Sequence, residues 1–257
     1  MRLAAERQGE GAKLVMLHGW GMNSSVWAEF AEALAEGFQV TRIDLPGHGH
    51  SAFADQLELR AWATACLDVA PERAVWVGWS LGSMVSLQSA LLAPSRIEGI
   101  VALAGMPRFV KGSNWQHAMA ATTLDQFIRN LRRDHRQTLQ RFLALQMMNS
   151  DHATRTLRRL KSLLRERPDP APEALRIGLE LLKSVDLRGQ LADLSCPTSW
   201  IYGGRDTLAP PGAGSELRHW LPQAAVHIVE GAGHTPFLSH PEETGQLIRR
   251  SLESMHG

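Results

Sequence analysis

A serine enclosed by two glycines is the first feature of this sequence that indicates chemistry. Ser80 lies in the stretch Gly78-Trp79-Ser80-Leu81-Gly82, between the apolar run 74–78 and the helical pattern 81–92. A G-x-S-x-G motif between a strand and a helix is typical of a nucleophile elbow, because small flanking residues let the turn tighten and leave the hydroxyl above the sheet. Such a serine can attack an acyl carbon. The alternative is a chance match in an ordinary strand–helix turn.

A serine nucleophile needs a base, and the base needs an orienting acid. In chains that carry this elbow the order is serine, acid, histidine, with both partners on loops that follow later strands. Asp206 follows the strand pattern 197–204 in YGGRDTLAP, and His234 follows the pattern 225–233 in EGAGHTP. We therefore predict a triad of Ser80, Asp206 and His234.

Other residues compete for these roles. His240 is the nearest rival among the eleven histidines, but the run HPEE that it begins is typical of a helix entry. Asp186 and Asp193 are competing acids, but they precede the 197–204 strand, so we assign them surface or capping roles.

The oxyanion of an acyl-transfer reaction needs two oriented donors. We expect one from the backbone N–H of Leu81 and the other from the loop His18-Gly19-Trp20-Gly21, with the N–H of Trp20 as the best candidate. His18 is interpreted as a residue that shapes this loop. His48 and His50 lie in LPGHGHS without a carboxylate or cysteine cluster, so we expect no metal site. No phosphate-binding glycine motif is present, and we expect no cofactor.

The elements that must position these residues alternate between strand and helix patterns, which predicts an α/β fold with a mostly parallel sheet flanked by helices. The strand patterns lie at 14–19, 38–47, 74–78, 97–105, 197–204 and 225–233. No strand pattern occurs from 108 to 188. We therefore expect a core of residues 1–107 and 189–257 with an inserted, all-helical cap at 108–188.

Composition places the chain among ordinary globular proteins. It has 257 residues, 44% of them apolar and 21% charged. Charges interrupt the N-terminal stretch where a signal peptide would need an apolar run, and no apolar segment is long enough to span a membrane. Its two cysteines are far apart and form no CxxC pair. We expect a cytoplasmic protein with free thiols and no membrane contact.

Charge is unevenly distributed along the chain. From Arg129 to Arg167 there are eleven arginines and lysines against three acids, while the whole chain carries a net charge of only +1. Arg129, Arg132, Arg133 and Arg136 have the spacing of one helical face. This basic face indicates either an acidic partner or a merely solvated surface. A nucleic-acid partner is disfavoured, because the segment lacks interleaved aromatic residues and the rest of the chain is net acidic.

The chain resembles the α/β-hydrolases over essentially its whole length. The motifs LVMLHGWG, DLPGHGHS, VGWSLGS, GGRDTLAP and GAGHTPFLSHPEE occur in the family's order. The cap segments RFLALQ and GLELLKSVDLR are more specific, and they are similar to those of the pimeloyl-[acyl-carrier protein] methyl ester esterases of biotin synthesis.

The resemblance implies a serine carboxylesterase that removes the methyl group from a pimeloyl chain held on acyl-carrier protein and releases methanol. It carries over the triad of Ser80, Asp206 and His234, and it makes Trp20 and Leu81 the oxyanion hole. It also places Phe142 along the acyl channel, with Trp20 as a second substrate-binding residue. The alternatives are a general short-acyl carboxylesterase without carrier dependence and a non-catalytic, hydrolase-like receptor.

In the resembled family, arginines of the cap hold the acidic carrier protein. Arg141 and Arg158 fall on such positions, and two others fall on Gln137 and Thr154. Arg136 and Arg155 are one residue away from those two, an offset that turns a helix by about 100°. These two residues and Arg159 are therefore possible carrier contacts. We expect the enzyme to be a monomer.

Overall fold

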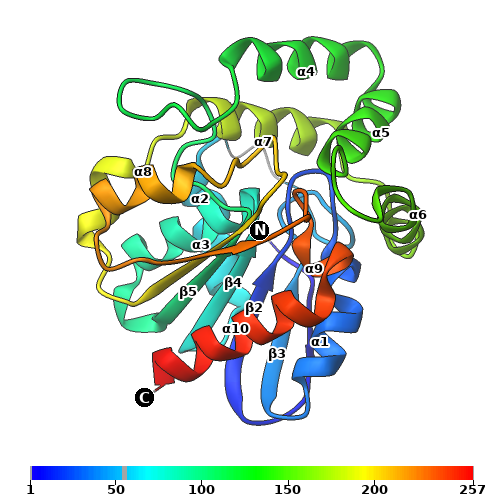
Figure 1. The fold of residues 1–257 in the computed structure, drawn as a ribbon. Coiled ribbons are helices and arrows are strands. Elements are labelled where there is room, and N and C mark those ends of the chain that lie inside the picture. Colours follow the sequence, from blue (N-terminus) through cyan, green and yellow to red (C-terminus); the bar gives the residue numbers. More distant parts are fainter. Residues whose placement is uncertain (1, 54–56, 257) are drawn as a thin grey trace.

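The computed structural model describes residues 2–53 and 57–256, and it consists of a central sheet with helices on both faces (Figure 1). Within these residues the sheet has seven strands in the order β1-β3-β2-β4-β5-β6-β7. Neighbouring strands are parallel except for β1 and β3, which are antiparallel. The strands are β1 Ala5–Gln8, β2 Ala12–Leu17, β3 Phe38–Ile43, β4 Ala74–Trp79, β5 Ile97–Leu103, β6 Thr198–Gly203 and β7 Ala225–Val229. The predicted α/β fold class is confirmed.

Helices α1 and α10 lie in front of the sheet as drawn in Figure 1, and α2 and α3 lie behind it. The α-helices are α1 Ala28–Leu34, α2 Leu59–Val69, α3 Leu81–Leu92, α4 Ala121–Arg133, α5 His135–Gln146, α6 Ala153–Leu164, α7 Pro172–Ser184, α8 Ala213–Trp220, α9 Pro236–Ser239 and α10 Pro241–His256. The described part of the chain also forms three short 3-10 helices, η1 Ser24–Trp27, η2 Pro94–Arg96 and η3 Arg188–Asp193. Among the described residues, no helix has both the length and the apolar character needed to cross a bilayer.

The middle of the sheet shows why these sequences form strands. All six residues of β4 are buried. A parallel strand that is covered by helices on both faces has this pattern, and its sequence is a continuous apolar run. Strands β4, β6 and β7 are parallel members of one sheet, so their carboxyl ends lie at the same edge. The loops that follow these three strands carry Ser80, Asp206 and His234. The topology thus brings the predicted triad to one edge.

Helices α4 to α7 form a helical insert between β5 and β6, and they lie above the sheet in Figure 1. Leu124, Ile128 and Leu131 of α4 are buried, as is typical of the apolar face of an amphipathic helix. The expectation that Arg136 shares one helical face with Arg129, Arg132 and Arg133 is wrong. Helix α4 ends at Arg133, and α5 begins at His135. The break lies at Asp134, whose extended backbone and side-chain bond to the Gln137 N–H cap the second helix.

Strand β1 has no counterpart among the predicted strands. It is a short edge strand of the sequence AERQ, with three exposed residues, so it shows no alternation of apolar and polar residues. Its Glu6 lies opposite Arg42 of β3, and the two side chains form an ion pair at 2.8 Å. Backbone pairing and charge, not burial, hold this strand.

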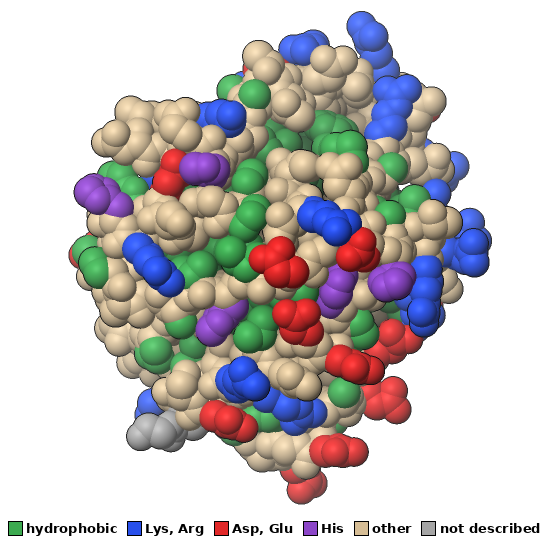
Figure 2. Space-filling view, viewed as in Figure 1, with side chains coloured by type: hydrophobic (Ala, Val, Ile, Leu, Met, Phe, Trp, Pro, Cys, Tyr) green, Lys and Arg blue, Asp and Glu red, His purple; other side chains and the backbone are tan. Residues whose placement is uncertain are grey.

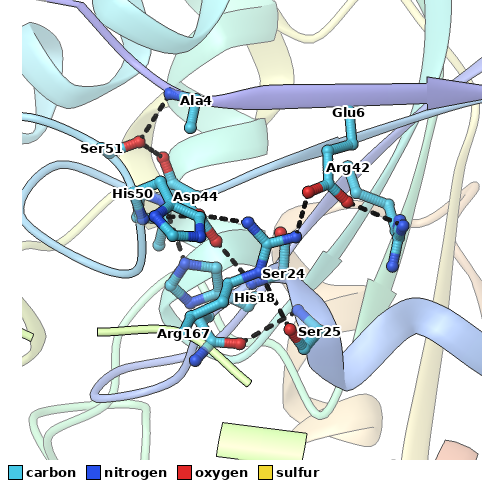
Figure 3. Close-up of polar contacts among 12 residues, drawn as sticks. Ala4, Glu6, His18, Ser24, Ser25, Arg42, Asp44, His50, Ser51 and Arg167 are labelled. Atoms are coloured by element: carbon cyan, nitrogen blue, oxygen red, sulfur yellow. Dashed lines mark hydrogen bonds and ion pairs between the residues drawn. The ribbon is translucent and has the colours of Figure 1, made fainter. Parts of the chain in front are cut away.

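A buried arginine joins the insert to the core (Figure 3). Arg167, in the connection between α6 and α7, has only 7% of its side chain exposed. It donates hydrogen bonds to the carboxylate of Asp44 at 3.1 Å, to the hydroxyl of Ser25 at 2.9 Å and to the carboxylate of Glu6. Asp44 also accepts backbone N–H bonds from Ser24 and His50, so its buried charge is fully compensated.

Candidate active site

Ser80 occupies a sharp turn between β4 and α3, with φ of 55° and ψ of −118°. This backbone conformation is strained for a residue with a side chain. A Cβ on Gly78 would lie 2.5 Å from the carbonyl oxygen of Gly82, and a Cβ on Gly82 would lie 2.5 Å from that of Leu17. Only glycine fits at either position. These clearances favour the nucleophile-elbow interpretation over a chance match.

Ser80, His234 and Asp206 form one hydrogen-bonded chain. His234 Nε2 lies 2.9 Å from Ser80 Oγ, and His234 Nδ1 lies 2.7 Å from Asp206 Oδ2. The other oxygen of Asp206 accepts the backbone N–H groups of Leu208 and Ala209, at 2.8 and 3.0 Å. The carboxylate therefore accepts the Nδ1 proton, and Nε2 is free to take a proton from the serine. All three triad side chains are buried.

The competing residues lie in other contacts. Asp186 binds the guanidinium groups of Arg188 and Arg108. Hydrogen bonding by Arg188, opposed in part by burial, lowers the pKa of the Asp186 carboxyl to about 2. Asp193 ends η3, and His240 directly precedes α10 with its Nδ1 2.9 Å from Ser239 Oγ. These contacts fit the surface and helix-entry roles that the sequence predicts for them.

The predicted oxyanion loop lies beside the serine, since a Cβ on Gly19 would be 3.2 Å from Ser80 Cβ. Two buried histidines hold this loop. His18 Nδ1 donates to the Gly19 carbonyl at 2.8 Å, and its Nε2 accepts the backbone N–H of Leu45 at 2.9 Å. His48 Nε2 accepts the N–H of Gly21 at 3.3 Å. Each ring must stay neutral to accept these bonds, and His18 therefore shapes the loop as predicted.

These two histidines give a pH-dependent stability. Burial lowers the pKa of His18 to about 4 and that of His48 to about 3, whereas an unfolded histidine titrates near 6.5. Below pH about 6.5 the unfolded chain binds protons that the folded chain does not. As the pH is lowered from about 6.5 to about 4, we expect the free energy of unfolding to decrease. The decrease should be up to about 1.4 kcal/mol per pH unit for each histidine. Denaturant unfolding at several pH values measures this slope. His48→Gln, which keeps an acceptor without titrating, should make the slope shallower, and an unchanged slope would contradict the assignment.

Trp20 joins the predicted oxyanion loop to the insert. Its ring is buried, its Nε1 donates to the Leu175 carbonyl of α7 at 2.7 Å, and its ring meets Phe142 of α5 edge-on at 4.7 Å. Phe142 in turn contacts Phe127 of α4, with ring centroids 5.4 Å apart. Of the predicted substrate-binding residues, Trp20 of the core and Phe142 of the insert are therefore in direct contact.

Gly178 of α7 is a site residue that the sequence prediction missed. A Cβ there would lie 2.6 Å from Cδ1 of Trp20 and 3.4 Å from a methyl carbon of Leu81. Glycine inside a helix costs about 1 kcal/mol relative to alanine, so it needs a packing reason. The signal in the sequence is an isolated glycine within the apolar helix pattern of GLELLK.

The predicted carrier-binding arginines lie on the outer surface of the insert but in different hollows. Arg155, Arg158 and Arg159 line one hollow of about 620 Å³ beside the start of α10. Arg141 lines another of about 420 Å³ between α5 and α6, where Thr154 also lies. Arg136 lines a third, near the α6–α7 connection, and forms a loose ion pair with Asp169. Figure 2 shows the basic side chains gathered over the insert and acidic ones over the body below it.

Comparisons with known proteins agree with this geometry. Residues 13–241 match the family model described as alpha/beta hydrolase fold. The chain is 41% identical to a pimeloyl-[acyl-carrier protein] methyl ester esterase of Photobacterium profundum, over 96% of this chain and 97% of the relative. It is also 41% identical to the protein of that name from Methylococcus capsulatus, over 99% and 100%.

Among solved structures, an esterase from Exiguobacterium antarcticum superimposes with a TM-score of 0.88 at 19% identity, covering 98% of this chain and 95% of that one. At this identity the superposition shows a shared fold. The two sequence relatives have a higher identity to this chain, 41%, and their matches cover 96% and 99% of it, including the insert. The chain therefore belongs to the alpha/beta hydrolase fold family and, within it, to the family of the pimeloyl-[acyl-carrier protein] methyl ester esterases.

Proposed function

We propose that this chain is a serine carboxylesterase that hydrolyses the methyl ester of pimeloyl-[acyl-carrier protein] to the free acid and methanol, a step in biotin synthesis. The observation that carries the proposal is the placement of His234 between Ser80 and Asp206, within hydrogen-bonding distance of both. The naming of the full-length relatives supports the choice of ester.

In the first half-reaction, His234 Nε2 takes the proton of Ser80 as Oγ attacks the carbonyl carbon of the methyl ester. Asp206 stabilises the imidazolium that forms. The carbonyl oxygen becomes an oxyanion, which the backbone N–H groups of Leu81 and Trp20 hold. His234 then gives its proton to the methoxy oxygen, methanol leaves, and the pimeloyl group remains esterified to Ser80.

In the second half-reaction, water replaces methanol and the roles repeat. His234 removes a proton from the water, whose oxygen attacks the acyl-enzyme carbonyl. The second tetrahedral intermediate collapses, the proton returns to Ser80 Oγ, and the free carboxylate is released. The thioester at the other end of the chain keeps the product on its carrier.

The position of the serine suggests which of the two acyl bonds is cleaved. Ser80 is 3% exposed beneath the insert, so a folded carrier cannot approach it. The thioester lies next to the carrier, whereas the methyl ester is at the far end of the acyl chain. The far end alone would reach the buried serine, and we place its path beside Trp20 and Phe142, whose rings are in contact.

We further propose that residues 108–188 work as a cap on a core of residues 1–107 and 189–257. The arginines on its outer surface would bind the acidic carrier while the acyl chain passes beneath. The cytoplasm is the proposed location, and the two free cysteines, Cys66 and Cys196, support it.

The direct test is to incubate the protein with methyl pimeloyl-[acyl-carrier protein] and to measure methanol and the free carboxylate. The same acyl group presented as a small dimethyl ester is the comparison. A much higher kcat/KM for the carrier-bound ester supports the proposal. Equal values would favour the general short-acyl esterase, and no turnover of either ester would favour the non-catalytic receptor.

Carrier docking should depend on charge. The basic surface attracts an acidic carrier over a range that salt reduces to about 8 Å at physiological ionic strength. We expect Arg141→Glu with Arg158→Glu to raise KM for the carrier-bound ester about tenfold and to leave the small ester within twofold. Steady-state kinetics at rising salt provide a second measurement, in which turnover of the carrier-bound ester should fall more steeply.

The matched control is Arg60→Glu, a reversal at an exposed arginine of α2 outside the insert. This variant should leave KM unchanged for both the carrier-bound ester and the small ester. If the control and the double variant behave alike, or if both esters respond equally to salt, the basic surface does not bind the carrier.

A further inference from the structure

The connection between α5 and α6 touches both loops that carry the histidine and the acid of the triad. We call residues 146–151 the α5–α6 strap. It begins at the last residue of α5 and ends before His152, the residue that precedes α6. Although it belongs to the insert, its hydrogen bonds run to the core.

On the histidine side, the strap is bound through the backbone. The N–H of His234 donates to the carbonyl of Gln146 at 3.0 Å, and the N–H of Asp151 donates to the carbonyl of Gly231 at 2.9 Å. A Cβ on Gly233 would lie 2.9 Å from the same Gln146 carbonyl. The histidine loop therefore lies directly against the strap at both of the strap's ends.

On the acid side, the strap is bound through an ion pair. Arg205, the residue before Asp206, donates from Nη1 to the Asp151 carboxylate at 2.7 Å and to the Asn149 carbonyl at 3.1 Å. The backbone N–H of Arg205 also donates to the carbonyl of Ala232 in the histidine loop, at 2.9 Å. Arg205 thus links the strap to both catalytic loops, through its side chain to the strap and through its backbone N–H to the histidine loop.

The strap has a defined shape. Asn149 in the strap and His152 directly after it both adopt the left-handed region, with φ of 64° and 59°, and asparagine tolerates that region better than most residues. Gly231 has φ of 75°, and a Cβ on it would lie 2.3 Å from an oxygen of Asp151. The Asp151 carboxylate is therefore packed against Gly231, a position whose positive φ favours glycine.

We propose that Asp151 and Arg205 are positioning residues, which hold the His234 and Asp206 loops at the distances that proton transfer from Ser80 requires. Ser80 is fixed separately, by the elbow between β4 and α3. The other two members lie on loops. The indole N–H of Trp79, the residue before Ser80, donates to the His234 carbonyl at 2.8 Å, and the strap supplies a second support at the His234 N–H. The inference rests on the hydrolase function proposed above.

A role in stability alone fits the pair poorly. The side chains of Arg205 and Asp151 are 51% and 47% exposed, and exposed ion pairs add little to the free energy of unfolding. Misplacing a catalytic group by about 1 Å, by contrast, can cost on the order of a hundredfold in rate. The effect of the pair should therefore appear in kcat and not in the melting temperature.

The experiment uses a small aryl ester, which does not require carrier docking. Asp151→Ala and Arg205→Met should each lower kcat about tenfold, with KM within twofold and an unchanged melting temperature. The double variant should lose no more than either single variant, because both remove the same contact. The low-field proton resonance of His234 Nδ1–H should shift or broaden in each variant.

Asp125→Ala is the matched control. Asp125 pairs with Lys183 at 2.6 Å within the insert, with side-chain exposures of 35% and 37%, and neither residue touches a catalytic loop. Its loss should leave kcat and the histidine resonance unchanged. An unchanged kcat in Asp151→Ala, additive losses in the double variant, or an equal loss in the control would each overturn the inference. Lack of turnover by the wild-type protein would instead contradict the hydrolase function itself.

Discussion

Replacing Ser80 with alanine is expected to reduce ester turnover by about 10⁶-fold, as the loss of the nucleophile does in serine proteases. In the proposed mechanism the Ser80 hydroxyl oxygen bonds to the acyl group, and no other described residue is placed 2.9 Å from His234 Nε2 in the same way. Steady-state kinetics measure the loss. A fluorophosphonate probe followed by mass spectrometry should locate the adduct on Ser80 in the wild-type protein.

The matched control is Ser89→Ala. Ser89 is likewise a buried serine, within α3, but its hydroxyl donates to the Val85 carbonyl at 2.8 Å, away from the triad. This variant should keep its activity, and both variants should keep the wild-type circular dichroism spectrum. Near-normal turnover in Ser80→Ala, or an adduct on another serine, would contradict the assignment of the nucleophile.

The second large effect is expected for Asp206→Asn, which should lower kcat by about 10⁴-fold. Asp206 Oδ1 accepts two backbone N–H groups, so the asparagine oxygen will occupy that position and its NH₂ group will face His234 Nδ1. Two donors cannot face each other, and the imidazole must then carry its proton on Nε2. In that tautomer it cannot accept the proton of Ser80.

Asp193→Asn is the control for this variant. Asp193 lies in η3, before β6, and should affect kcat by less than twofold. The pH dependence of kcat adds a second measurement, because the Asp206→Asn enzyme should regain activity at high pH only through hydroxide attack. If Asp193→Asn proved the more damaging of the two, the acid of the triad would have been misassigned.

Much of the fold and of the triad geometry could be predicted from the sequence, because strong local patterns determine both. Strand β4 reads as an uninterrupted apolar run, since it is buried on both faces. The loops after β4, β6 and β7 could be placed at one edge because parallel strands end together. Gly78 and Gly82 marked the elbow, since only glycine tolerates the contacts found there.

Features that depend on contacts between distant residues could not be predicted. Strand β1 is polar and exposed, so no alternation indicated it, and its ion pair with Arg42 depends on a partner 36 residues away. Arg167 was counted as one charge of a basic segment, yet its side chain is buried against the core. A count of charges describes only the composition of a segment. Whether one of its side chains is buried depends on the contacts that the segment makes with distant loops and strands.

The Asp151–Arg205 pair was missed for the same reason. The two residues are separated by 54 positions, and neither belongs to a recognisable motif. The glycines that face the strap, Gly231 and Gly233, belong to a stretch of small residues before His234. The sequence alone did not show what these glycines contact. Their contacts explain why small residues are needed there.

Arg167 also bears on how the molecule is made. Its partners Glu6, Ser25 and Asp44 precede it by 161, 142 and 123 residues. At about 5–20 residues per second, a ribosome needs roughly 6–25 s to travel from Asp44 to its arginine. During that interval the nascent N-terminal half carries a carboxylate without its guanidinium partner. A gene shortened by deleting the insert would make that condition permanent, because it would leave Asp44 in the core without its arginine. For this protein, trimming to a minimal hydrolase would require removing the buried acid together with the helices above it.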